Sequence, residues 1–200
     1  MVKKCVSNKL YGSLAWCDGA STRPGIRRNV YYIPRRDIVK WPVLPALSGE
    51  QAMATAAVMT GDFTLAESKK WLRLDVLTTK SDVTSETQGE YPNFTSLNKA
   101  TLFYGDTNEE ATGFCRLAIQ DDLIYLVQQQ NGKFRVLGSE FYGNTETKVS
   151  QKQGQGITAS DMGTTIEIQC SDECPAPYYP GKIETEDGDI SGLDGGAAGG

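Results

Sequence analysis

Histidine is absent from the 200 residues of this chain. A protein without imidazole has no Ser-His-Asp or Cys-His triad, no imidazole proton relay and no histidine ligand for zinc or iron. The groups left for catalysis are carboxylates, lysine, tyrosine, serine and cysteine. The absence therefore excludes many enzyme classes and leaves a wide range of non-enzymatic roles.

Long apolar runs are also missing. No stretch approaches the roughly 18 apolar residues of a membrane span, and the sequence after Lys4 is too polar for a signal-peptide core. We therefore expect a chain that folds in a cytoplasm, has no membrane partner and keeps its cysteines as free thiols. Cys5 and Cys17 together with Cys170 and Cys174 could supply four thiolates to zinc, but their spacings fit no standard zinc motif.

Motifs for bound groups are incomplete. Gly154-x-Gly156 lacks the Lys-Ser/Thr of a phosphate-binding loop, and Asp187-Gly188-Asp189 lacks the rest of a calcium loop. The acidic pairs 109–110 and 121–122 lie at an expected helix start and before an expected strand, where acids commonly cap or solvate. We expect no cofactor, no metal and no enzymatic activity, and a His-free hydrolase is the enzymatic alternative.

The size and the distribution of charge predict three regions. A 200-residue chain with 39% hydrophobic residues can build one core without disulfides or metals. Residues 1–40 hold nine basic and two acidic residues, whereas 184–200 hold five acids and no base. We expect an extended, basic, loop-rich arm over 1–60, a β-sandwich core over 61–183 and an acidic, glycine-rich tail over 184–200. The basic arm suits an acidic neighbouring subunit better than a nucleic acid, because it has no nucleic-acid-binding motif.

Most periodic segments indicate β-structure. Short strands are expected at 28–33 and 37–41, and residues 71–104 are expected to form one long hairpin with a large polar end at 78–93. The sharpest signal is Asn131-Gly132 between two β-rich runs, which predicts a type I′ hairpin over 123–137. A strictly alternating strand follows at 164–170, after a polar loop expected at 144–163.

One helix is expected, over residues 107–120. Thr107 or Asn108 can cap it, and Glu109 and Glu110 suit its first turn. Apolar residues then recur at helical spacing at Ala111, Phe114, Cys115, Ala118 and Ile119. The run 49–59 is compatible with a short helix or a loop. The order of elements predicts a mainly β fold: an antiparallel β-sandwich or barrel with one flanking α-helix and extended N- and C-terminal arms.

Three segments, 24–34, 132–138 and 174–179, resemble small virion proteins of tailed phages of gut bacteria, and the element order is similar to that of the phage tail-tube family. The resemblance covers about residues 20–187. It implies hexameric rings that stack into a tube, with other tail proteins as partners and with DNA passing through the lumen without specific binding. It also implies synthesis in the host cytoplasm and a final location in the virion tail. The alternatives are a head-decoration or tail-completion protein, or a carbohydrate- or host-binding β-module using Tyr31, Tyr32, Trp41, Tyr178 and Tyr179.

This interpretation predicts which residues touch neighbouring copies. The four arginines Arg27, Arg28, Arg35 and Arg36 are expected to pair with acids of adjacent copies. The end of the long hairpin is expected to order against a neighbouring ring, through Asp82, Glu86, Glu90 and Tyr91.

Overall fold

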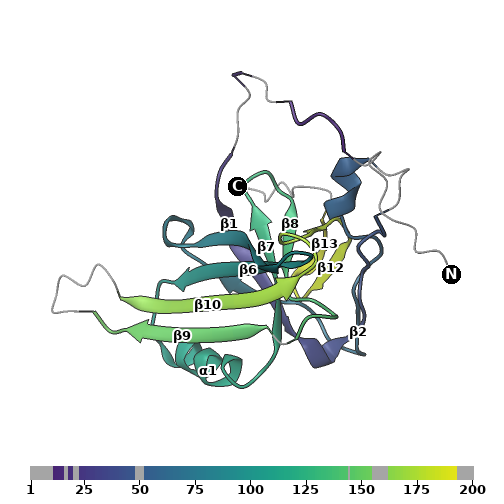
Figure 1. Cartoon of the computed structure of the whole chain (residues 1–200). Helices are drawn as coiled ribbons and strands as arrows, with labels where there is room; N and C mark the ends of the chain where they lie inside the picture. The colour runs from purple at the N-terminus through teal and green to yellow at the C-terminus, as the bar shows by residue number, and fades with distance from the viewer. Residues whose placement is uncertain are drawn as a thin grey trace.

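The computed structural model describes residues 11–15, 18–19, 23–47, 52–143, 145–154 and 162–192. Within these residues the fold is mainly β, with antiparallel sheets and a single α-helix, as the sequence predicts. A five-stranded sheet has the order β11 (Tyr178–Tyr179), β8 (Phe134–Leu137), β7 (Leu123–Gln129), β1 (Ile26–Pro34) and β4 (Leu72–Asp75). A four-stranded sheet has the order β5 (Asp82–Glu90), β6 (Asn93–Tyr104), β10 (Gly163–Asp172) and β9 (Glu146–Lys152), of which β6, β10 and β9 lie side by side in Figure 1.

The two sheets pack face to face around one hydrophobic core. The four-stranded sheet contributes fully buried side chains such as Leu102 and Ile166, and the five-stranded sheet contributes Val30 and Val127. Alternate residues of β6 and β10 point into this core and the others point to solvent, as in a half-buried antiparallel sheet. This arrangement is the predicted β-sandwich.

A second core covers the other face of the five-stranded sheet. Ile124 and Leu126 on β7 point into it, and Trp71 and Ile183 pack from the opposite side. Two small two-stranded sheets help to form this third layer. They are β2 (Ile38–Lys40) with β3 (Thr64–Leu65), and β12 (Lys182–Thr185) with β13 (Gly188–Ser191). Burial on both faces explains why almost every residue of β7 is buried.

Parts of the segments expected as arms, 1–60 and 184–200, belong to the sheets. β1 lies inside the expected arm 1–60, yet it is paired on both sides, with β7 and β4, and Val30 is fully buried. The β12–β13 hairpin likewise extends into the expected tail: Ile183 points inward, and Lys182 pairs with Glu184 and Asp189 on the solvent side. In both segments apolar residues lie between charged ones, and the apolar side chains form the buried face of the strand.

The long hairpin predicted over 71–104 is wrong. β4 pairs with β1 in the five-stranded sheet, and a short 3-10 turn, η4 (Thr78–Lys80), carries the chain across to the other sheet. The real hairpin is β5–β6, with Glu90 opposite Asn93 at its end. The expected polar end is mostly a regular edge strand, because an edge strand with one solvated face needs few apolar residues.

The expected polar loop at 144–163 also contains a strand. β9 pairs with β10 along its whole length, from Glu146 opposite Gln169 to Lys152 opposite Gly163. Its inward residues are Thr147, Val149 and Gln151, of which only Val149 is apolar. A strand with one apolar residue gives no clear hydrophobic alternation.

The predicted helix and hairpin are confirmed, with one change of turn type. α1 (Glu109–Ala118) is capped by the Asn108 side chain, which accepts a hydrogen bond of 2.9 Å from the Ala111 N–H. In the β7–β8 hairpin only Gly132 has positive φ, at 89°, whereas a type I′ turn requires it at both central residues. The Gly132 N–H donates to Gln129 O, so the loop is a type I turn followed by a glycine bulge. A 3-10 segment, η3 (Met53–Ala57), falls within the run left open as helix or loop.

Candidate assembly interface

The four-stranded sheet ends in two long edge strands. β5 has nine residues and β9 has seven, and no strand among the described residues pairs with the outer edge of either. Such edges present unpaired backbone N–H and C=O groups, which can pair with another chain. The sequence-based prediction placed β9 in a loop, so it did not identify the second edge of this sheet.

The charges on these edge strands share the solvent face of the sheet. Asp82, Thr101, Glu167 and Lys148 form one cross-strand row, so their side chains point to the same face. Even-numbered residues of both edge strands therefore lie on this face, opposite to the inward valines 83 and 149. β5 presents three acids there, at positions 82, 86 and 90, and β9 presents Lys148, Lys152 and one acid at 146. One edge is acidic and the other carries an excess of lysine.

Few of these charges are committed to strong contacts within the chain. Glu86 pairs with Lys99 on β6, and Lys148 lies 3.0 Å from Glu146, but all four side chains are well exposed. Exposed pairs of this kind contribute little stability. Among the described residues Asp82 and Lys152 have no ion pair. These side chains can therefore take a new partner at low cost.

The tip of the β5–β6 hairpin exposes aromatic surface. Tyr91 is 86% exposed and Phe94 54% exposed, with Pro92 between them. Apolar groups gathered at a projecting tip are typical of contact surfaces. Of the residues predicted for the hairpin end, Asp82, Glu86 and Glu90 lie on β5, and Tyr91 lies at this tip.

The four arginines predicted to contact adjacent copies have partners within the chain. Arg28 lies 3.1 Å from Asp75, Arg36 pairs with Asp121, and an Arg27 nitrogen lies 3.5 Å from the Gln130 carbonyl oxygen. Because β1 is a central strand, the arginines on β1 and on the following 3-10 turn, η2 (Arg35–Asp37), reach acids and carbonyls beside their own sheet. Their pairing with adjacent copies stays a prediction.

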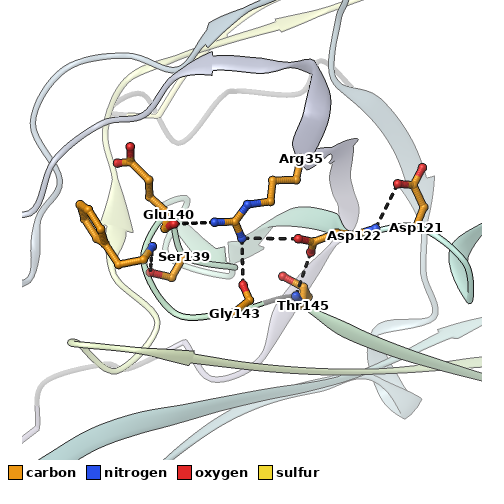
Figure 2. Close-up of polar contacts among 8 residues, drawn as sticks. Arg35, Asp121, Asp122, Ser139, Glu140, Gly143 and Thr145 are labelled. Atoms are coloured by element: carbon orange, nitrogen blue, oxygen red, sulfur yellow. Dashed lines mark hydrogen bonds and ion pairs between the residues drawn. The ribbon is translucent and has the colours of Figure 1, made fainter.

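Arg35 forms the most extensive of these clusters (Figure 2). Its guanidinium lies 3.4 Å from the Asp122 carboxylate and donates to the carbonyl oxygens of Gly143 and Glu140 at 3.0 and 2.6 Å. Asp122 in turn accepts a 2.8 Å hydrogen bond from the Thr145 N–H. The cluster therefore ties the start of β7 to the loop that leads into edge strand β9.

Other candidate sites have less support. Of the aromatics proposed for sugar binding, Tyr31, Trp41 and Tyr179 are buried in the second core, and the Arg135 guanidinium lies 3.7 Å from the ring centroid of Tyr178. Within the described part of the chain these residues form no open aromatic platform.

The cysteines and acids of the described ranges offer no metal site. Cys5 and Cys17 lie outside the described residues, and burial raises the pKa of the Cys170 thiol to about 12, which disfavours the thiolate that binds metals. In the described ranges no group of three or more Cys, Asp or Glu side chains is arranged to hold a metal ion. The 109–110 acids lie in the first turn of α1, and the 121–122 acids pair with arginines.

An apolar groove of about 690 Å³ lies between η3 and β11. Lys133 is its only charged lining residue in the described structure. Apart from Lys133, its titratable lining residues in the described ranges are Tyr178 and Tyr179, and no carboxylate lines it.

Comparisons with family models, curated proteins and solved structures each find no match to this chain. The described part of the chain contains no helix long and apolar enough to cross a membrane.

Proposed function

We propose that the chain is a structural subunit of a tailed-phage virion, specifically a tail-tube subunit that forms rings by joining sheet edges. The observation that carries the proposal is that the four-stranded antiparallel sheet has two long edges with which no other described strand pairs. With an even number of strands, the two edge strands run in opposite directions. A neighbouring copy in the same orientation therefore continues the antiparallel sheet without a break.

This kind of contact closes naturally into a ring. It joins two different surfaces of the chain, β5 on one copy and β9 on the next, and such heterologous contacts generate rings when the rotation closes. Six copies of a four-stranded sheet at about 4.8 Å between strands give a circumference of roughly 115 Å, or about 37 Å across, and strand tilt widens it further. A lumen of this size admits a DNA duplex.

The bulk of the subunit decides which face of the sheet lines that lumen. The five-stranded sheet and the third layer all lie behind the inner face of the four-stranded sheet. Because the outside of a ring has more room than the inside, the solvent face of the four-stranded sheet is the lumen face. Its charged residues are five acids and three lysines: Asp82, Glu86, Glu90, Glu146, Glu167, Lys99, Lys148 and Lys152. A lumen with this excess of acid does not hold DNA phosphates.

The test is the assembly state of the purified full-length chain. Analytical ultracentrifugation and negative-stain electron microscopy should reveal rings and stacked tubes at high protein concentration, and duplex DNA should not be retained at physiological salt. A chain that stays monomeric or trimeric at every concentration contradicts the tail-tube proposal. That result would favour the binding-module or head-decoration alternatives.

A further inference from the structure

We infer that β5 of one copy pairs with β9 of a second copy in one defined register, with Asp82 opposite Lys152 and Glu86 opposite Lys148. This inference rests on the proposed self-assembly and identifies the two surfaces that meet. It is carried by the positions of the charges on the two edge strands.

The charges on the two edges have the same spacing. Asp82 and Glu86 are four residues apart on β5, and Lys148 and Lys152 are four residues apart on β9. In an antiparallel pair one register therefore brings both acids opposite both lysines. The same register places Thr84 opposite Ser150, so that polar side chains face each other between the two ion pairs.

The side-chain faces agree with this register. All four charged residues project from the solvent face of their own sheet. Pairing even-numbered residues with even-numbered residues keeps that face continuous across the junction, and the inward valines 83 and 149 stay on the core side. A one-residue shift would place each acid opposite an inward-facing position.

The backbone agrees as well. Along the row Asp82, Thr101, Glu167 and Lys148, hydrogen-bonded and non-hydrogen-bonded pairs alternate from one strand pair to the next. Asp82 and Lys148 therefore both direct their backbone groups into the sheet, or both direct them outward. The same holds for every even-numbered residue of the two strands, so the register matches backbone donors and acceptors in either case.

A register shifted by four residues is the closest competitor. It would place Glu86 opposite Lys152 and Glu90 opposite Lys148, but it extends β9 beyond the end of β5 to Tyr91 and Pro92. Proline has no N–H to donate. The first register instead pairs all seven residues of β9 with residues 82–88, so it makes the longer ladder.

The charges involved have little else to bind. Asp82 and Lys152 have no ion pair among the residues that the structure describes, and Glu86 and Lys148 have only exposed neighbours on their own sheet. Lysines on an edge strand usually prevent association with other edges. The lysines of β9 instead attract the acidic edge strand β5 of another copy, and they still repel the β9 strand of another copy.

The experiment reverses the charges on each edge of the full-length chain. Lys148→Glu/Lys152→Glu and Asp82→Lys/Glu86→Lys should each raise the protein concentration needed for ring assembly by about tenfold or more, because two attractive pairs per junction become repulsive. The quadruple variant restores both pairs and should assemble like the wild type. An equimolar mixture of the two double variants should also form rings, of alternating composition.

Matched controls separate this effect from net charge. Lys40→Glu/Lys70→Glu changes the net charge by the same amount as Lys148→Glu/Lys152→Glu. Glu67→Lys/Glu186→Lys changes it by the same amount as Asp82→Lys/Glu86→Lys. All four control positions are exposed and lie away from both edges. Both controls should assemble like the wild type. Circular dichroism checks that each variant is folded.

The outcomes distinguish the register from the function. If the wild type forms rings but the quadruple variant and the mixture do not, the register is wrong and the proposed function stands. If the double variants assemble like the wild type, the register is again wrong. If the wild type never assembles, both proposals fail. Should a reversal unfold the chain, the pair Asp82→Asn and Lys152→Gln gives a double-mutant cycle on assembly, in which additive effects overturn the pairing.

Discussion

The Arg35 guanidinium lies 3.4 Å from the Asp122 carboxylate, 87 residues further along the chain, and donates to two carbonyl oxygens of the loop before β9. Both side chains are largely buried, with 24% and 18% of their surfaces exposed. One side chain thus joins the end of β1, the start of β7 and the approach to an edge strand. The position of the proposed interface depends on this contact within the subunit.

Arg35→Ala should destabilise the protein by about 2–4 kcal/mol, because it leaves a half-buried carboxylate and two carbonyl oxygens without their donor. Arg28→Ala is the matched control, since the Arg28 side chain is 71% exposed and pairs with one acid, Asp75. It should cost less than about 1 kcal/mol. Urea unfolding of both variants checks the difference, and equal losses would show that the Arg35 cluster has no special structural role.

Gly138 begins the same loop, at a position that has no room for a side chain. Its φ is +124°, and a Cβ there would lie 2.4 Å from Ile124 Cδ1. Gly138→Ala should cost about 3 kcal/mol or more through backbone strain and the clash. Gly143→Ala, at φ +55° with nothing within 4 Å of the added Cβ, should cost only about 1 kcal/mol. Thermal melts of the two variants measure the contrast.

Burial of Asp172 predicts a pH dependence of folding. Desolvation raises the pKa of this carboxyl to about 6, partly offset by hydrogen bonds from the Glu173 N–H and from Ser139. The folded state therefore binds its proton more tightly than the unfolded state, and this group destabilises the fold as the pH rises from about 4 through 6. Asp172→Asn should add about 1–3 kcal/mol of stability at pH 7.5 and little at pH 4. Urea titrations at both pH values check this, with the exposed Asp187→Asn as control; equal effects of Asp172→Asn at the two pH values would contradict it.

The exposed tip of the β5–β6 hairpin is predicted to contact a neighbouring ring. Tyr91→Ser/Phe94→Ser should leave the melting temperature nearly unchanged, because both side chains project into solvent. Rings should still form, since β5 and β9 are intact, but electron microscopy should show fewer and shorter tubes. Val39→Ser/Leu47→Ser removes two exposed apolar side chains elsewhere and should have no effect on tube length. If the tip variant forms tubes of normal length, the tip does not take part in the contact between stacked rings.

The parts of the fold that follow from local signals could be predicted from the sequence. The helix carries its own cap at Asn108, and the β7–β8 hairpin carries its own turn at Gly132. From residue 164 to residue 172, strand β10 alternates between buried residues and residues that are at least partly accessible. From these elements the mainly β class and the sandwich followed.

The sheet partners were missed because they depend on contacts far apart in the chain. β4 is followed closely by β5, but η4 sends the two strands to different sheets. β9 has one inward apolar residue, Val149, so it resembles a loop until β10 is placed beside it. Of the two edge strands in the proposed contact, only the acids of β5 were therefore predicted from the sequence. The spacing of Lys148 and Lys152 was the signal that could have revealed the other half.

Hydrogen–deuterium exchange on the full-length chain tests edge-to-edge assembly most directly, by comparing the protein at concentrations above and below ring formation. Edge-to-edge assembly predicts that amide protection rises in both edge strands, at 82–90 and 146–152, and stays constant in β4 (Leu72–Asp75), one edge of the other sheet. Unchanged exchange in β5 and β9 while particles form, or protection gained at β4 instead, would contradict the assembly of this protein through the edges of its four-stranded sheet.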